Sequence, residues 1–207
     1  MKTEVIKASN PVAISHARDV LNNGGLVVFP TDTVYGLAVL PYWKEYVERL
    51  YIVKRRDASR AIAVLISDVS DLDKVAISPG EVAIRLAGKF WPGPLTIVLP
   101  RHPDLPDALS VNPTIGVRVP DHPVAIKLLQ ATGPLAVTSA NLSGSDNTNS
   151  AAEVLSQLDG RVHLIIDGGP TPGGIPSTVV DCTVPKIQIL RQGPISEEEL
   201  LQAINQN

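Results

Sequence analysis

Short apolar runs alternate with amphipathic segments along almost the whole chain, and this alternation constrains the fold more than any other feature. The apolar runs predict strands at residues 26–29, 61–66, 94–99, 116–119, 135–140, 163–167, 178–182 and 187–190. Apolar residues at helical spacing predict helices at residues 11–23, 43–54, 68–76, 80–90, 122–131, 151–160 and 196–204. The pattern is typical of an α/β domain with a twisted, mixed or largely parallel open sheet flanked by helices.

The composition sets the size and the chemistry of the core. A chain of 207 residues is long enough for a substantial core and fits one domain, residues 1–207. Only 4% of the residues are aromatic, so the core must consist of Val, Ile, Leu and Ala. The four prolines of residues 100–113 predict a long ordered loop rather than a domain boundary.

Charge, cysteine content and missing motifs exclude several classes of protein. A net charge of −3 argues against a positive coat for nonspecific nucleic-acid binding. The single cysteine, Cys182, cannot form an internal disulfide, and the sequence has neither a signal segment nor an apolar run of membrane-spanning length. These features predict a cytoplasmic protein without membrane contact. There is no P-loop, dinucleotide-binding or zinc-protease motif, and the scattered histidines argue against a metal centre.

Polar side chains follow the first apolar run in the stretch "FPTDTVYG". Thr31, Asp32 and Thr33 come directly after the proline that ends the predicted strand. Ligands of α/β sheets bind beyond the carboxyl ends of strands, which would make this loop a wall of a binding site. The alternative is a turn whose hydroxyl groups cap their own backbone, and the local sequence leaves both interpretations open.

A cluster of cations stands at the end of the second predicted helix, in "KRRDASR". Lys54, Arg56 and Arg60 would converge on a polyphosphate if the chain turns here, because arginine forks match phosphate oxygens and lysine supplies a point charge. A solvated helix end whose cations complement the helix dipole is an equally good interpretation of the same residues.

Three later stretches place further polar groups at strand ends. In "VTSANLSG", Ser139 and Asn141 offer hydroxyl and amide groups suited to a phosphate or a ribose. Arg118 lies inside a predicted strand and needs a carboxylate there, from the protein or from a ligand. Ser177 and Arg191 border the last two predicted strands.

Taken together, these stretches resemble the YrdC-like family of L-threonylcarbamoyladenylate synthases. The matching stretches are "FPTDTVYGLA", "VKRRDASRAIAVLI", "FWPGPLTIVL", "GVRVPDHPVAIKLL", "TSANLSG", "DGG" and "STVVD…ILRQGPIS". The family's hallmark is K-x-R followed far downstream by S-x-N, which corresponds here to Lys54 and Arg56, then Ser139 and Asn141. The resemblance is to the short, single-domain form.

The resemblance implies a fold, a reaction and partners. The fold is a twisted α/β sheet with a large concave cavity. The reaction makes L-threonylcarbamoyl-AMP from L-threonine, bicarbonate or CO2, and ATP, with release of pyrophosphate. A separate transferase then moves the threonylcarbamoyl group to an adenosine of tRNA. The family's concave face is often basic, which adds tRNA or double-stranded RNA as an expected partner, and Mg2+ on the phosphates would share the charge neutralisation.

The resemblance also implies roles for individual residues, with Lys54 and Arg56 as the catalytic cations. The residues implied for ATP are Lys54, Arg56, Arg60, Ser139, Asn141 and Arg191. The residues implied for threonine are Thr31, Arg118, Val137 and Ser177. Since the reaction joins two anions, a site rich in cations and hydroxyl groups, without a nucleophile, suits it.

Three positions depart from the family pattern. Asp57 stands where proline is frequent, Arg60 where asparagine or lysine is found, and Leu65 where some members have a histidine that contacts threonine. Asp57 would put a carboxylate beside the phosphate site, where it would weaken binding or help to hold Mg2+. The Asp57 and Leu65 departures leave open a paralogue of the YciO type. Another alternative is a module that binds double-stranded RNA or tRNA without catalysis, against which the negative net charge and the lack of interleaved aromatic and basic residues argue. A third is a relative of hydrogenase-maturation proteins that uses carbamoyl phosphate, but those carry acylphosphatase and zinc-finger segments that this sequence lacks.

Overall fold

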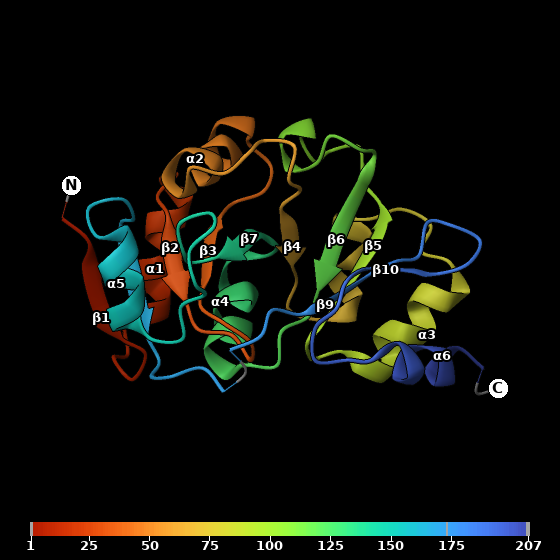
Figure 1. Cartoon of the computed structure of the whole chain (residues 1–207). Helices are drawn as coiled ribbons and strands as arrows, with labels where there is room; N and C mark the ends of the chain where they lie inside the picture. The colour runs from red at the N-terminus through yellow and green to blue at the C-terminus, as the bar shows by residue number, and fades with distance from the viewer. Residues whose placement is uncertain (1, 173, 206–207) are drawn as a thin grey trace.

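The computed structural model describes residues 2–172 and 174–205, and ten strands within these residues form one mixed sheet. The strands are β1 (Glu4–Lys7), β2 (Val27–Phe29), β3 (Gly36–Val39), β4 (Ala63–Leu65), β5 (Leu95–Pro100), β6 (Thr114–Arg118), β7 (Leu135–Ser139), β8 (Leu164–Asp167), β9 (Thr178–Asp181) and β10 (Gln188–Arg191). Their order in the sheet is β1-β8-β2-β3-β7-β4-β6-β5-β9-β10. The sheet extends across the whole molecule, with the N-terminus at one end and the C-terminus at the other (Figure 1).

Helices flank the sheet, as the alternating sequence pattern predicts. The α-helices are α1 (Ala13–Asn22), α2 (Lys44–Lys54), α3 (Glu81–Phe90), α4 (Pro123–Thr132), α5 (Ala151–Leu158) and α6 (Glu197–Asn205). Two 3-10 helices, η1 (Val69–Lys74) and η2 (Asp107–Leu109), lie in the connections. Helices α1 and α4 pack against each other, and α3 packs against α6 at the C-terminal end of the sheet (Figure 1).

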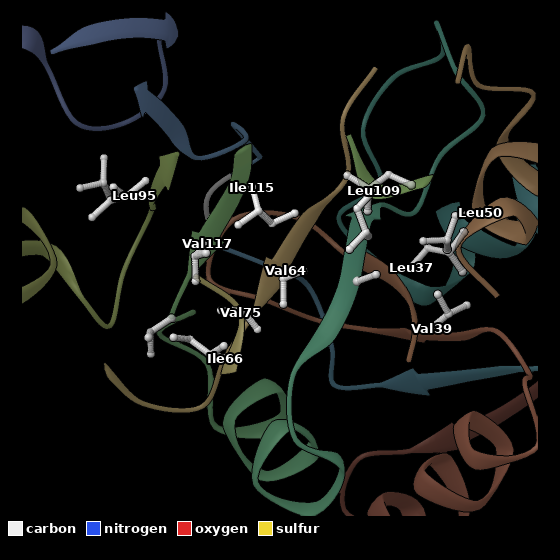
Figure 2. Close-up of a cluster of buried hydrophobic side chains, with 14 of the residues drawn as sticks. Leu37, Val39, Leu50, Val64, Ile66, Val75, Leu95, Leu109, Ile115 and Val117 are labelled. Atoms are coloured by element: carbon white, nitrogen blue, oxygen red, sulfur yellow. The ribbon is translucent and has the colours of Figure 1, made fainter. Parts of the chain in front are cut away.

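Alternate residues of each strand enter different apolar layers, because successive side chains of a strand point to opposite faces. In β2, Val28 joins the large cluster that includes α2 and α3, whereas Val27 and Phe29 join the cluster that includes α1 and α4. Figure 2 shows part of the large cluster, in which Leu50 of α2 packs with Leu37. Both clusters consist mainly of Val, Ile, Leu and Ala, as the low aromatic content requires.

The structure corrects three details of the predicted elements. Strands β1 and β3 were not predicted, and the segment after Asp68 forms a 3-10 helix instead of an α-helix. Helix α1 begins at Ala13 instead of Pro11, after a turn in which the Asn10 side chain accepts a hydrogen bond from the Val12 amide. Of the two predicted kinds of sheet, the mixed one is found, because β3 and β7 insert antiparallel pairings into its centre.

The proline-rich segment 100–113 is an ordered loop, as predicted. Arg101 donates hydrogen bonds to the carbonyl oxygens of Pro106 and Ser110 at 3.3 and 3.1 Å. Leu109 is buried, and its carbonyl oxygen accepts the Ile62 amide at 2.8 Å. No helix among residues 2–172 and 174–205 is long and apolar enough to cross a membrane.

A partly buried histidine is expected to make the fold sensitive to acid. The Leu26 amide donates to His163 Nδ1 at 2.9 Å, and burial, with Arg49 nearby, lowers the pKa of His163. A folded-state pKa below the unfolded value of about 6.5 gives stability that is complete above that pH and is lost as the pH falls. When the pH is lowered from about 7.5 to about 5.5, we expect the melting temperature of His163→Gln to fall by less than that of the unmodified protein. Equal losses would contradict the acceptor role of Nδ1.

Candidate active site

One cavity of about 510 Å³ is lined by every residue for which the family resemblance implies a role in ligand binding. These residues are Thr31, Lys54, Arg56, Arg60, Arg118, Val137, Ser139, Asn141, Ser177 and Arg191. They come from loops and strands that are far apart in the sequence. The volume lies within the usual range for small-molecule and cofactor sites.

The cavity lies over the face of the central strands that turns away from the large apolar cluster. In β5, Ile97 enters the cluster and Thr96 lines the cavity, while in β6 Val117 enters the cluster and Gly116 lines the cavity. Small residues keep the floor open: a Cβ at Gly116 would come within 3.0 Å of Thr96 Cγ2, and one at Gly36 within 2.8 Å of a Val137 methyl group. The period-two pattern of the strands therefore builds both the core and the hollow opposite it.

Lys54 joins the two halves of the K-x-R and S-x-N pattern directly. It is the last residue of α2 and is 1% exposed. Its Nζ donates to the carbonyl oxygen of Ser139, and to the carbonyl oxygen and Oδ1 of Asn141 at 2.6 and 3.0 Å. Burial of the ammonium, together with Arg56 and Arg60 nearby, lowers the pKa of Lys54 to about 7. The oxygens around Nζ stabilise its charged ammonium form, which burial without hydrogen bonds would disfavour more strongly.

The S-x-N loop is ordered by its own side chains as well. Ser139 Oγ donates to Asn141 Oδ1 at 2.6 Å, and Asn141 Nδ2 donates to the Ser145 carbonyl oxygen at 2.6 Å. The Ser143 amide donates to the Lys54 carbonyl oxygen at 2.9 Å, which ties the loop to the end of α2. The polar groups of this loop thus have fixed positions along one side of the cavity.

Arg118 finds its carboxylate within the protein. Its side chain donates to Asp32 Oδ1 at 2.5 Å, to Thr33 Oγ1 at 3.0 Å and to the Gly93 carbonyl oxygen at 2.9 Å. The pair is largely buried, with 6% of the Arg118 side chain and 13% of the Asp32 side chain exposed. Asp32 Oδ1 also accepts the Asp121 amide at 3.1 Å, so Asp32 fixes Arg118 and two loops in place.

The loop after β2 combines both interpretations of its threonines. Thr31 Oγ1 donates to the Val34 carbonyl oxygen at 2.7 Å and accepts the Thr33 amide at 3.2 Å, so this hydroxyl caps its own turn. Thr31 and Thr33 nevertheless both line the cavity. Val137 presents its side chain to the cavity, while its main chain lies in the sheet between β3 and β4.

Tyr35 closes the same loop against a distant segment. Its ring is buried, and its hydroxyl donates to the Gly169 carbonyl oxygen at 2.7 Å and accepts the Gly168 amide at 3.3 Å. Burial raises the pKa of the Tyr35 hydroxyl to about 12. The glycine-rich segment 167–174, for which the sequence predicts a mobile flap or a long turn, is anchored here; its residue 173 lies outside the described residues.

Two hydroxyls connect Arg191 to the cavity floor. Arg191 donates to the Ser177 carbonyl oxygen through Nε at 3.0 Å and through Nη2 at 2.8 Å, and Nη2 also reaches Ser177 Oγ at 3.0 Å. Ser177 Oγ in turn lies 2.8 Å from Thr96 Oγ1. Sequence reasoning missed Thr96, although the polar residue inside the apolar run "PLTIVL" was a signal for it.

The cavity carries a strong positive charge. Lys54, Arg56, Arg60, Arg118 and Arg191 line it, and no Asp or Glu is among the described residues of its wall. The cations affect one another: burial, Arg118 and Arg56 lower the pKa of Arg191. In residues 2–172 and 174–205 there is also no group of three His, Cys, Asp or Glu side chains able to hold a metal ion. The geometry therefore suits a ligand with several negative charges.

Comparison with known proteins identifies the family of this chain. The family model Sua5_yciO_yrdC, described as "Telomere recombination", matches residues 19–193, which is most of the chain. The chain belongs to the Sua5/YciO/YrdC family. The α/β fold and the family resemblance predicted from the sequence are confirmed.

Several family members are similar over nearly all of this chain. "Threonylcarbamoyl-AMP synthase" of Bacillus subtilis is 38% identical over 196 residues, which are 93% of this chain and 57% of that protein. The crystal structure of P. abyssi Sua5 complexed with L-threonine has a TM-score of 0.90 and 38% identity, over 93% of this chain and 57% of that one. E. coli YciO has a TM-score of 0.85 and 32% identity, over 96% of this chain and 98% of that one. The chain thus spans little more than half of the first two relatives.

The structure also locates the departures from the pattern of the Sua5/YciO/YrdC family. Asp57 is exposed and does not line the cavity; its carboxylate accepts the Ser59 amide at 2.9 Å, which lowers the pKa of Asp57. Asp57 therefore stands outside the cavity wall, although Arg60 lies near enough to contribute to the lowering of its pKa. Arg60 and Leu65 do line the cavity. The Arg56 side chain donates hydrogen bonds to the carbonyl oxygens of Arg60 and Ala61, at 3.2 and 3.0 Å, and these bonds hold it in place.

Proposed function

We propose that the chain synthesises L-threonylcarbamoyl-AMP from L-threonine, bicarbonate or CO2, and ATP, with release of pyrophosphate. The observation that supports it is the convergence of five cationic side chains on one cavity, with no carboxylate among the described lining residues. Family members that carry this activity in their names support it too. The product would serve a separate transferase that modifies tRNA.

The reaction requires alignment and charge neutralisation more than acid or base catalysis. The threonine amine adds to CO2 and gives N-carboxythreonine, whose new carboxylate attacks the α-phosphorus of ATP while pyrophosphate leaves. Both reactants of the second step are anions, so fixed cations lower its barrier. Lys54, Arg56 and Arg60 line the cavity from the end of α2 and the segment after it, and Arg118 lines it from the end of β6. Cations from two separate elements would let a triphosphate and an amino acid lie side by side.

The proposed roles follow this division of the cavity. The K-x-R cations, Arg60, the S-x-N loop and Arg191 would hold the nucleotide, and Thr31, Arg118, Val137 and Ser177 would surround the amino acid. Mg2+ prefers phosphate and carboxylate oxygens. Since the described lining offers hydroxyl and amide oxygens but no carboxylate, Mg2+ would be held mainly by the phosphates of ATP and would help to neutralise them.

Arg56 and its neighbour Arg55 offer a matched test. Arg56 lines the cavity, whereas Arg55 is exposed, lies outside its wall and follows α2 in a left-handed conformation with φ 52°. We expect Arg56→Gln to reduce formation of pyrophosphate and threonylcarbamoyl-AMP by at least ~10-fold, about 1.4 kcal/mol of transition-state stabilisation, and Arg55→Gln to leave it within about twofold. The measurement is a product assay with ATP, bicarbonate and L-threonine.

The same assay separates the alternatives. Absence of product with threonine would overturn the proposal and favour a YciO-type function. Two observations support that alternative: the match to E. coli YciO along nearly its whole length, and the presence of Leu65 in the cavity wall. RNA binding that persists in an inactive Arg56→Gln protein would favour an RNA-binding module. Product formed equally with any amino acid would exclude a dedicated threonine site.

A further inference from the structure

Thr96 is a buried hydroxyl on the cavity floor to which neither the sequence nor the proposed function gives a role. It is 5% exposed and lies on β5. Ile97 of β5 pairs with Val117 of β6 in the antiparallel ladder. Thr96 precedes Ile97 and Arg118 follows Val117, so these two residues lie opposite each other and their side chains point to the same face of the sheet. Both line the cavity. Thr96 therefore shares the Arg118 side of the site.

The hydrogen bonds around Thr96 leave one hydroxyl proton without a protein acceptor in the described structure. Arg191 Nη2 donates to Ser177 Oγ at 3.0 Å, and Ser177 Oγ and Thr96 Oγ1 are 2.8 Å apart. The two hydroxyls carry two protons, and only one of them lies between the oxygens. Since the arginine already donates to Ser177, the cooperative direction runs from Arg191 through Ser177 to Thr96, which leaves the Thr96 proton to point into the cavity.

A donor at the end of such a chain is suited to an oxyanion. The cation at its start polarises both hydroxyls, and a hydrogen bond to a charged acceptor is stronger than one between neutral groups. The Arg118 guanidinium, on the same side of the site, attracts the same kind of group. Its Nε and both terminal nitrogens already donate one hydrogen bond each within the protein, which leaves two N–H groups for an anion. A hydroxyl donor on the same face would supplement these two groups.

We propose that Thr96 is a binding residue whose hydroxyl donates a hydrogen bond to the carboxylate of the amino-acid substrate beside Arg118. This inference rests on the proposed function. It adds a hydrogen-bond donor that is not among the residues implied by the family resemblance. It also gives Ser177 the role of orienting the Thr96 hydroxyl, in addition to any contact that Ser177 makes with the substrate.

Calorimetric titration of the full chain with L-threonine tests the inference in Thr96→Val, which keeps the shape and removes the hydroxyl, and in Thr96→Ser, which keeps the hydroxyl. We expect Thr96→Val to bind L-threonine at least ~10-fold more weakly and Thr96→Ser to stay within about threefold. L-threoninamide, which has an uncharged amide in place of the carboxylate, should bind equally weakly to all three proteins. Thr3→Val is the matched control, because Thr3 is a buried threonine beside β1 and outside the cavity wall. Its hydroxyl donates to the Val162 carbonyl oxygen at 2.9 Å and accepts the Gly160 amide at 2.8 Å.

The outcomes separate this inference from the proposed function. Unchanged L-threonine affinity in Thr96→Val, or an equal loss for L-threonine and L-threoninamide, would overturn the role of Thr96 while threonine binding itself stands. No L-threonine binding by the unmodified protein would overturn both. A rise in KM for threonine with kcat and the KM for ATP unchanged would support a contact made in the ground state.

Discussion

Lys54→Met is expected to lower the rate of threonylcarbamoyl-AMP formation by at least ~100-fold, about 2.7 kcal/mol. The substitution removes a cation from the cavity and also the donor that holds the carbonyl oxygens of Ser139 and Asn141. The S-x-N loop would lose its anchor to α2 together with the charge. A single-turnover assay with saturating ATP measures the loss at the chemical step.

The control for Lys54 lies at the other end of the same helix. Lys44 begins α2, and its side chain is 67% exposed, 3.6 Å from Glu48. Lys44→Met should change the rate by less than about twofold, since an exposed ion pair contributes little. Similar losses in both variants would show that the effect comes from α2 as a whole and not from the ammonium in the cavity.

Proton uptake gives a second measure of Lys54. With a pKa of about 7, its amine is mostly neutral at about pH 8 in the free protein, and a polyanion bound beside it raises that pKa. ATP binding at about pH 8 should therefore take up protons, which titrations in buffers of different ionisation enthalpy detect. The terminal phosphate of ATP contributes equally in Lys54→Met, so the difference between the two proteins reports Lys54. Equal uptake would contradict the assignment.

Arg118→Met is expected to lower the free energy of unfolding by about 3–5 kcal/mol, the typical cost of removing one partner of a buried ion pair. The Asp32 side chain, which is 13% exposed, would lose the cation that compensates its carboxylate. The hydrogen bonds from Arg118 to Thr33 and Gly93 would be lost as well. Urea unfolding measures the change. Arg18→Met, which breaks the exposed pair with Asp19, should cost less than about 0.5 kcal/mol.

A double substitution shows whether the uncompensated charge is the cause. When Asp32→Leu is added to Arg118→Met, neither charge of the pair remains, and the double variant should be more stable than Arg118→Met alone. If the two losses simply add, the pair contributes through packing and not through charge. The double variant should still be inactive, since Arg118 and the loop that it fixes both border the cavity.

Much of the fold followed from periodicity. All eight predicted strands occur, at slightly different bounds, because apolar runs of this length are stable only when buried in a sheet. Strand β3 escaped prediction because its four residues directly follow the polar loop, and its partner β7 lies a hundred residues further along the chain. Strand β1 has one buried residue among exposed ones and pairs only with β8, so its local pattern is weak.

The candidate site was predictable as a set of residues but not as a network. Motif residues at strand ends indicated which side chains would meet, and all of them line one cavity. Their partners were not visible in the sequence: Asp32 for Arg118, the carbonyl oxygens of Ser139 and Asn141 for Lys54, and Thr96 for Ser177. A hydrogen bond depends on positions within a few tenths of an ångström, which local pattern does not encode.

The sequence by itself determined the α/β class, the apolar composition of the core and the residue types available at the ends of the strands. Only the tertiary structure decided the strand order, and with it the face of each strand that lines the cavity. The physical reason is that side chains alternate between the two faces of a strand, so their destination is set by the register with neighbouring strands. In this protein those neighbours, such as β7 between β3 and β4, come from distant parts of the chain.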